Sequence, residues 1–265
     1  MVEFAWRDER GQVGALARGA VIVTAFPSAG LATTVAGHYM IRSLKLPRVG
    51  RFESPDLSPI AVVQGGEVNP TIRVYGRNDL ALVLSEFPPT PSQANAVAKT
   101  VLDAAEKQGA RLILCLEGVV PHPSEEEEEG GSPEPDSSPP EQVWVAFSTK
   151  DPATVKTFLD TGARPLEDGV IGGVSGALLI QGLGRKVMVA ALLVSARVPE
   201  GLPDHRAGAA LIETLDRLLP ELKIDTGPLR KQAEQIERML RAAMKTRPAI
   251  TEPPSEAHPA QSMYG

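Results

Sequence analysis

Cysteine, aromatic side chains and long apolar runs are all scarce in this sequence. The 265 residues include one cysteine, Cys115, so no disulfide can form within the chain. Aromatic residues make up 4% of the chain, which leaves aliphatic side chains to fill the core. The longest apolar run, residues 187–196, is about half as long as a membrane-spanning helix. Because the N-terminal residues also show no signal-peptide pattern, we expect a soluble cytoplasmic protein without a membrane partner.

Sequence motifs that carry well-known chemistry are missing as well. The chain has no phosphate-binding loop of the glycine-x4-glycine-lysine type and no glycine-x-glycine-x-x-glycine turn after a strand. None of the four histidines pairs with another at metal-ligand spacing, and Cys115 has no obvious histidine partner. The formal net charge of −6 argues against nucleic acid as a general partner. We therefore expect no catalytic residues, no metal and no cofactor.

The stretch from Gly19 to Leu44 has the pattern of the opening unit of an α/β domain. Residues 19–25 are apolar and rich in β-branched side chains, which is typical of a strand buried on both faces. A proline ends this strand, and apolar residues at helical spacing follow from Leu31 onward. We expect Ser28 to cap this helix and Gly30 to allow the tight turn before it.

Further strand and helix patterns extend this unit into one domain of residues 1–246. Apolar segments at 60–64 and 71–75 flank Gly65-Gly66 and predict a β-hairpin. Its antiparallel pairs join a parallel α/β core, so the central sheet should be mixed. The other expected strands are residues 48–52, 80–85, 111–116, 143–148 and 186–197. Helices are expected after caps at Ser92 and Asp204, from Asp151-Pro152 onward, and over residues 178–183.

Two segments have a composition that does not favour folding. Residues 121–142 contain five consecutive glutamates, four prolines in their second half and almost no apolar side chains, and residues 247–265 are rich in proline and polar groups. Such segments bury too little apolar surface to offset the entropy of ordering them. We expect a disordered acidic insert within the domain, which serves solubility, and a flexible C-terminal tail.

Two turns of small residues could hold an anion on backbone N–H groups at a helix start. The first contains Ser28 and Gly30, and the second contains Gly172, Gly173 and Gly176. The same residues also suit ordinary tight strand-to-helix turns. The sequence leaves both interpretations open.

The final helix, which opens at Thr226-Gly227-Pro228, carries an apolar stripe. Leu229, Ala233, Ile236 and Leu240 follow one another at intervals of four, three and four residues. A stripe of this kind can pack on its own domain or form a contact between subunits. Both interpretations remain open, because two heptads are too few to establish a coiled coil.

Several short segments stand in a recognisable order within residues 16–246. They are Phe26 to Leu31, Ser54 to Leu57, Glu67-Val68 with Pro70, Arg73 to Tyr75, Leu84 to Glu86 with Pro88, Gly169 to Leu179, and Ile224-Asp225-Thr226 before a charged helix. Taken together, this ordered set resembles the archaeal branch of the proteasome assembly chaperone family. The chain departs from the family at Ser28-Ala29, where a glycine is common, and in the strong acidity of the insert.

The resemblance implies a three-layer α/β/α fold with a mixed central sheet, similar to purine nucleoside phosphorylases, and a C-terminal helix. It also implies a homo-oligomer whose C-terminal hydrophobic-tyrosine-any residue motif docks between α-subunits of the proteasome core particle. Met263, Tyr264 and Gly265 fit that motif. A carboxylate, a tyrosine ring and a methionine suit a shallow socket, and several weak tails on one oligomer bind together. The resemblance therefore predicts a non-enzymatic chaperone or activator.

Two other functions remain open at this point. The fold resemblance and the glycine turns also suit a small-molecule enzyme of the nucleoside-phosphorylase or carboxylate-amine-ligase type. An oligomeric scaffold with an inert tail is the third possibility, because the resemblance implies self-association whether or not the tail binds.

Overall fold

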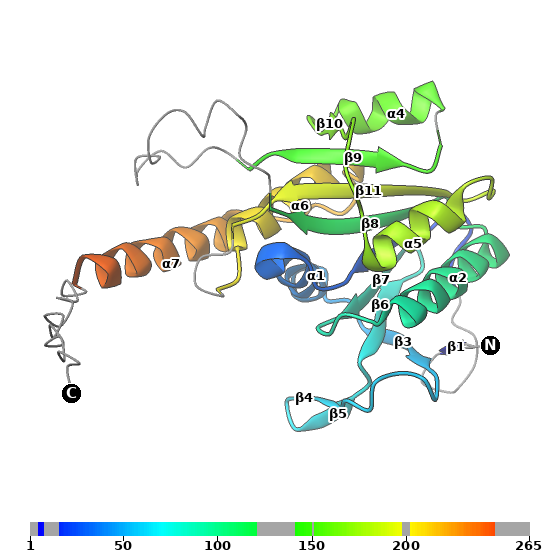
Figure 1. Cartoon of the computed structure of the whole chain (residues 1–265), viewed down its shortest axis with the longest axis horizontal. Helices are drawn as coiled ribbons and strands as arrows, with labels where there is room; N and C mark the ends of the chain where they lie inside the picture. Colours follow the sequence, from blue (N-terminus) through cyan, green and yellow to red (C-terminus); the bar gives the residue numbers. More distant parts are fainter. Residues whose placement is uncertain (1–4, 8–15, 121–140, 150, 198–201, 247–265) are drawn as a thin grey trace, which may run out of the picture.

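The central element of the fold is a mixed sheet of nine strands with helices on both faces (Figure 1). The computed structural model describes residues 5–7, 16–120, 141–149, 151–197 and 202–246, with the backbone alone for 5–7, 240, 241 and 243–246. In spatial order the strands are β1 (Ala5–Arg7), β3 (Arg48–Glu53), β6 (Ile72–Arg77), β7 (Leu80–Ser85), β2 (Val21–Ala25), β8 (Leu112–Val119), β11 (Met188–Ser195), β9 (Val143–Phe147) and β10 (Arg164–Pro165).

The sheet is parallel in its centre and antiparallel towards its first edge. Neighbouring strands from β7 through β2 and β8 to β11 are parallel, whereas β1, β3, β6 and β7 pair antiparallel in turn. At the other edge, β9 runs antiparallel to β11 and parallel to β10. The expected mixed sheet is therefore confirmed.

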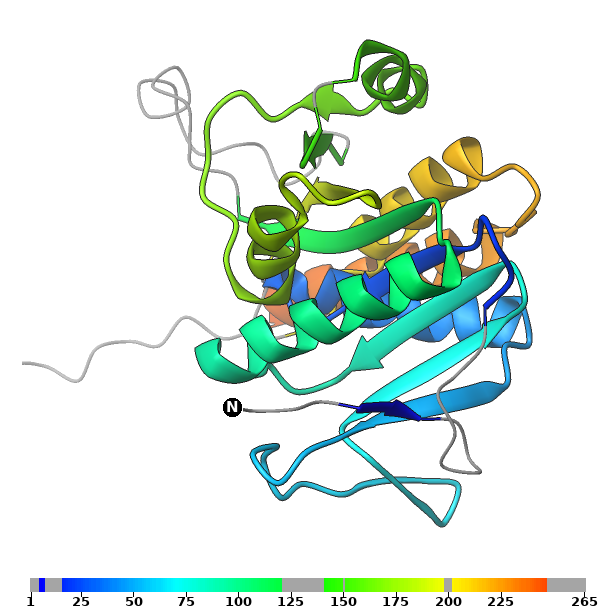
Figure 2. The same ribbon diagram turned by 90° about the vertical axis from the view of Figure 1, so that its right-hand side faces the viewer.

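Helices cover the sheet in two layers (Figures 1 and 2). The helical segments are η1 (Ala29–Leu31), α1 (Ala32–Ser43), α2 (Pro91–Gln108), α4 (Pro152–Leu159), α5 (Gly173–Gly182), α6 (His205–Leu218) and α7 (Gly227–Thr246). Side chains of α1, α6 and the start of α7 share one apolar core with one face of the sheet, and those of α2 and α5 share a second core with the other face. The three-layer architecture is as expected.

Close packing of α1 depends on its small residues. Ala32, Ala36 and Met40 are buried against the sheet. A Cβ atom added at Gly37 would stand 2.5 Å from Leu84 Cδ1 and 3.2 Å from Ala25 Cβ, so a larger residue there would have to displace the Leu84 side chain. The small-residue face of this helix is thus the face that lies on the sheet.

Two predicted helix caps are wrong. Leu31, with φ of 51°, is the N-cap of α1, and Ser28 makes no capping hydrogen bond. Thr90 rather than Ser92 caps α2, in a capping box with Gln93. The helix start at Asp151 and the cap at Asp204 are confirmed, and each carboxylate accepts a hydrogen bond from the backbone N–H three residues later.

The predicted hairpin has a different second strand. Gly65 and Gly66, with φ of 59° and 84°, turn the chain between β4 (Val62–Gln64) and β5 (Glu67–Asn69), which pair only with each other. Residues 72–77 instead form β6, which pairs with β3 and β7. The sequence pattern missed β5 because a three-residue strand shows hardly any alternation.

Two predicted boundaries also shift. The expected helix over residues 178–183 is α5, which begins five residues earlier, at Gly173. The acidic insert was expected to reach residue 142, but Arg230 Nη1 donates to Glu141 Oε2 at 2.8 Å, and Gln142 exchanges two hydrogen bonds with Ser195. Residues 121–140 and the tail at 247–265 lie outside the described residues.

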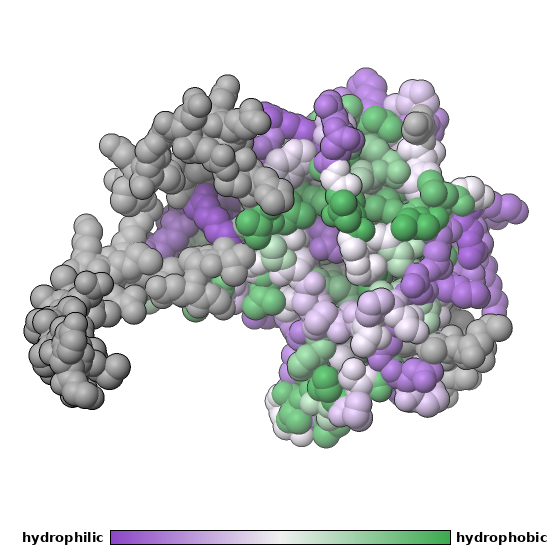
Figure 3. Space-filling model, viewed as in Figure 1, coloured by the Kyte–Doolittle hydropathy of each residue, from purple (hydrophilic) through white to green (hydrophobic). Residues whose placement is uncertain are grey.

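Some apolar side chains reach the surface. Figure 3 shows them gathered over α5 and the segment before it, and over the β4–β5 hairpin. Val170 is 98% exposed and Val68 is 71% exposed. Contiguous surface of this kind is typical of protein–protein contact. No helix within the described ranges is long and apolar enough to cross a bilayer.

Candidate functional site

The carboxyl end of β8 is where both predicted glycine turns meet the sheet. In open α/β sheets, ligands bind outside the carboxyl ends of the strands, at the point where the strand order reverses. Here that point lies between β2 and β8, because the chain places β3, β6 and β7 on one side of β2 and then crosses to β8 on the other side.

Backbone packing fills this crevice instead of leaving it open. Ser28 Oγ accepts a hydrogen bond from the Gly118 N–H at 2.9 Å, and the Gly30 carbonyl accepts one from the Asp204 N–H at 2.7 Å. A Cβ atom added at Gly118 would stand 2.3 Å from the Ala29 carbonyl oxygen. The first turn, with Ser28 and Gly30, therefore serves to seat the chain against β8.

The second glycine turn is the start of α5. The Gly176 N–H donates to the Gly172 carbonyl at 3.0 Å, and a Cβ at Gly176 would stand 2.2 Å from the Ile171 carbonyl oxygen. Gly172 and Gly173 are exposed, with open space around their Cβ positions. Close approach explains Gly176, so the structure adds no support for an anion at this turn.

A buried carboxyl group that the sequence analysis missed lies beside the two turns. Ser175 Oγ in the first turn of α5 donates to Glu117 Oε1 at 2.6 Å. Burial raises the pKa of Glu117 to about 7, although the hydrogen bond from Ser175 opposes the shift. The signal was present in the sequence, since a glutamate directly follows the apolar run that ends at Leu116. Near neutral pH this carboxyl can bind or release a proton.

Cys115, two residues earlier on β8, is inert. The residue is fully buried, and burial raises the pKa of its thiol to about 12. The thiolate is the reactive form of cysteine. Cys115 is therefore a residue of the apolar core.

A second polar cluster joins β6, the end of β7 and α1. The fully buried Arg73 donates from Nη2 to Glu86 Oε1, and His38 Nε2 lies 3.0 Å from the same oxygen. Burial alone would raise the pKa of Glu86, but His38 and Arg73 together lower it below its usual value. The Arg73 guanidinium also lies 6.0 Å from the ring centre of Tyr75. We interpret this cluster as a clamp between α1 and the antiparallel half of the sheet.

The apolar stripe of α7 is divided between core and surface. Leu229 is 1% exposed and Ala233 is 4% exposed, so these side chains pack on their own domain and leave no free surface for a second subunit. Ile236 is only half-buried, and Met239 is 70% exposed. The side chain of Leu240 lies outside the described residues.

Ion pairs fix α7 on α6. Arg230 Nη2 donates to Glu213 Oε2 of α6 at 2.9 Å, and Arg206 of α6 pairs with Glu237 of α7. Together with the buried Leu229 and Ala233, these ion pairs fix the orientation of α7 relative to α6.

The remaining predicted site residues, Met263, Tyr264 and Gly265, lie outside the described residues. Over the ranges that are described, no group of three or more histidine, cysteine, aspartate or glutamate side chains is arranged to hold a metal ion.

Comparison with known proteins gives concordant results. A sequence model of the PAC2 family matches residues 22–244. The chain is 26% identical over 221 residues to the uncharacterized protein MJ0106 of Methanocaldococcus jannaschii, which covers 83% of this chain and 84% of that protein.

Solved structures show the same fold. PbaA of Pyrococcus furiosus, described as an archaeal homolog of proteasome-assembly chaperone, superposes with a TM-score of 0.75 at 24% identity and covers 92% of each chain. PbaB of the same organism, described as an archaeal proteasome activator, gives a TM-score of 0.70 at 20% identity, over 92% of this chain and 100% of PbaB. At these identities the likeness concerns the fold.

Proposed function

The chain belongs to the PAC2 family, and on that premise we propose that it is a non-enzymatic assembly chaperone or activator of the proteasome core particle. One observation carries the proposal. The fold shared with PbaA and PbaB extends over 92% of the chain, and both of those proteins are described in terms of the proteasome. A cytoplasmic location follows from such a partner.

The C-terminal residues are the proposed docking element. Met263, Tyr264 and Gly265 enter pockets between α-subunits of the core particle, where the carboxylate meets a cation or backbone N–H groups and the tyrosine ring fills an apolar socket. Residues 247–262 act as the tether, which spans roughly 20–25 Å as a flexible coil.

Self-association provides several tails at once. We assign the contact between subunits to α7 from Ile236 onward, with Leu240 on the same stripe, because Leu229 and Ala233 are already used within the domain. One tail buries little surface and binds weakly, but tails on one oligomer bind with a high effective concentration.

The enzyme alternative has less support from the geometry. The crevice between β2 and β8, where a nucleoside or phosphate binds in folds of this kind, is occupied by the Ser28–Gly30 turn packed on Gly118. A thermal-shift screen with nucleosides, phosphate and ATP tests this alternative. Stabilisation by any of these ligands would favour the enzyme.

A pull-down with proteasome α-subunits tests the proposed function. The full-length chain should retain assembled α-subunits, and a chain that lacks residues 263–265 should not. Ser262→Ala serves as the control, because it alters the tail but leaves the docking residues. Equal retention by the truncated chain would contradict the docking role.

A further inference from the structure

An apolar surface lies over α5 and the segment before it (Figure 3), and we call it the α5 surface. Val170 is 98% exposed there and Ile180 is 70% exposed. Residues 169–184 contain no charged side chain, whereas the exposed Glu167 and Asp168 directly precede them. A contiguous apolar surface of this kind is typical of protein–protein contact. The α5 surface therefore suits a partner that is apolar and carries positive charge at one end.

The outer part of α7, residues 236–246, has these complementary properties. Figure 1 shows it projecting away from the sheet. Met239 is 70% exposed and Ile236 is half-buried. From residue 238 onward the helix contains no acidic residue, and its basic residues there are Arg238, Arg241 and Lys245. The segment spans about 15 Å, which matches the length of α5.

The outer part of α7 and the α5 surface belong to opposite faces of the sheet. Leu229, at the start of α7, packs in the core on one face, whereas Val174 and Leu178 of α5 pack in the core on the other face. A contact between the two surfaces therefore has to join two subunits.

We propose that the outer part of α7 of one subunit packs on the α5 surface of the next, with its basic residues beside Glu167 and Asp168. The inference rests on the self-association proposed above and names the surface that receives α7. Open space at the Cβ positions of residues 172–173 leaves room beside Val170 for the flexible side chain of Met239. Contact between two different surfaces of identical subunits closes into a ring when the rotation between subunits allows it.

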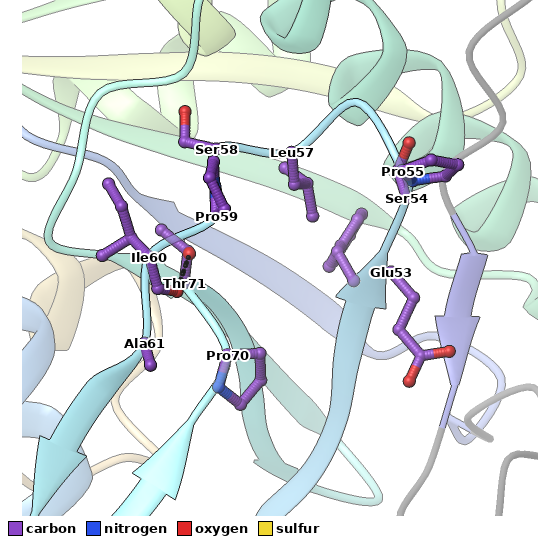
Figure 4. A pocket seen from close by; sticks show the side chains of 11 residues that line it. Glu53, Ser54, Pro55, Leu57, Ser58, Pro59, Ile60, Ala61, Pro70 and Thr71 are labelled. Atoms are coloured by element: carbon purple, nitrogen blue, oxygen red, sulfur yellow. Dashed lines mark hydrogen bonds between the residues drawn. The ribbon is translucent and has the colours of Figure 1, made fainter.

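The second exposed apolar surface, on the β4–β5 hairpin, suits α7 less well. A groove of about 820 Å³ lies beside the hairpin, and Figure 4 shows Leu57 and Pro70 in its wall and the Glu53 carboxylate at its rim. Arg51 pairs with this carboxylate at 2.5 Å, so the rim is already neutralised. The hairpin therefore serves as the comparison in the test.

Two variants that each lack one side of the contact test the proposal. Ile236→Glu alters the α7 side, and Val170→Glu alters the α5 side at a fully exposed position. Each variant alone should be a monomer in light scattering after size-exclusion chromatography, because the contact would have to bury a charge. A mixture of the two should form a one-to-one dimer, because each chain supplies the surface that the other has lost. Val68→Glu on the hairpin is the matched control and should keep the mass of the unchanged chain.

The outcomes separate this inference from the proposed self-association. A mixture that stays monomeric, or a Val170→Glu chain with the mass of the unchanged oligomer, would overturn the contact with α5 and leave self-association standing. A monomeric Val68→Glu chain would assign the contact to the hairpin instead. If the unchanged chain is itself a monomer, both proposals are wrong.

Cysteine crosslinking locates the contact independently. Cys115 is fully buried and burial raises the pKa of its thiol to about 12, so it should not react. Met239→Cys combined with Val170→Cys in one chain should give a ladder of covalent multimers with a short bismaleimide, and neither single variant should. Dimers from Met239→Cys alone would mean that two α7 helices pair with each other, which would overturn the inference.

Discussion

Glu117 places its carboxyl group between β8 and α5, where Ser175 donates a hydrogen bond to it. The pKa of this carboxyl is about 7 in the folded chain, compared with 4.5 for an unperturbed glutamate. Between these pH values the folded chain binds a proton that the unfolded chain has released. The free energy of unfolding therefore decreases as pH rises from 4.5 to 7, by about 3 kcal/mol.

Replacement of this carboxyl should remove that pH dependence. Glu117→Gln keeps an acceptor for Ser175 but cannot ionise, so at pH 8 the variant should be more stable than the unchanged chain by about 2–3 kcal/mol. Near pH 4.5 the two should be similar. Urea denaturation at several pH values measures this, with the exposed Glu167→Gln as control. An unchanged pH slope in Glu117→Gln would mean that the carboxyl is not buried as described.

The close packing of the Ser28–Gly30 turn on β8 depends on Gly118. A methyl group at this position meets the Ala29 carbonyl oxygen at 2.3 Å, so Gly118→Ala should destabilise the fold by about 1–3 kcal/mol. Gly169→Ala is the matched control, because its new methyl group meets only the end of the flexible Leu166 side chain. Urea denaturation should separate the two variants. Equal stability of both would show that the turn is loosely packed.

At the scale of single elements, strongly patterned segments were predictable. The buried strands β2 and β7 and the amphipathic helices α2 and α6 follow from runs of apolar residues, and their residues are buried as the pattern requires. Asp151 was identified as a helix start and Asp204 as a cap, because an acidic residue stands at the start of each helix pattern.

The predictions that were wrong concern alternatives that the spacing of residues in the sequence does not distinguish. Thr90 and Ser92 flank the same proline, and both residue types cap helices, so only tertiary structure selects Thr90. The start of α5 was also missed, because its glycines are typical of a turn rather than a helix. Gly176 lies inside the helix, where its close contact with the Ile171 carbonyl requires glycine. The Glu117–Ser175 hydrogen bond joins residues 58 positions apart and has no local signal.

The outer part of α7 is the element on which the proposed self-association depends. Ile236→Glu places a charge on the exposed part of the stripe and should convert the proposed oligomer to a monomer, because the contact would have to bury that charge. Gln235→Glu adds the same charge at a neighbouring exposed position and should leave the oligomer intact. Light scattering after size-exclusion chromatography gives the masses. The same mass for both variants would place the contact elsewhere.

At the scale of the whole molecule, the family was predictable from an ordered set of short segments. The match to the PAC2 family over residues 22–244 and the fold shared with PbaA confirm that resemblance. The segments include Arg73 to Tyr75 and Leu84 to Glu86, and the structure gives two of them a physical role. Arg73 and Glu86 form an ion pair, and His38 of α1 contacts the same Glu86 oxygen, so the cluster holds α1 on the sheet. The subunit arrangement and the tail stay predictions.

The central claim is that a rigid α/β body presents several C-terminal tails to sockets on the proteasome core particle. Its most direct test is the dissociation constant for the core particle, measured for the full chain, Tyr264→Ala and Ile236→Glu. We expect Tyr264→Ala to weaken binding at least tenfold, and loss of multivalency in Ile236→Glu to weaken it by about a hundredfold or more. Ser262→Ala should bind like the unchanged chain. If Tyr264→Ala binds as tightly as the unchanged chain, the tails do not dock and the account is wrong.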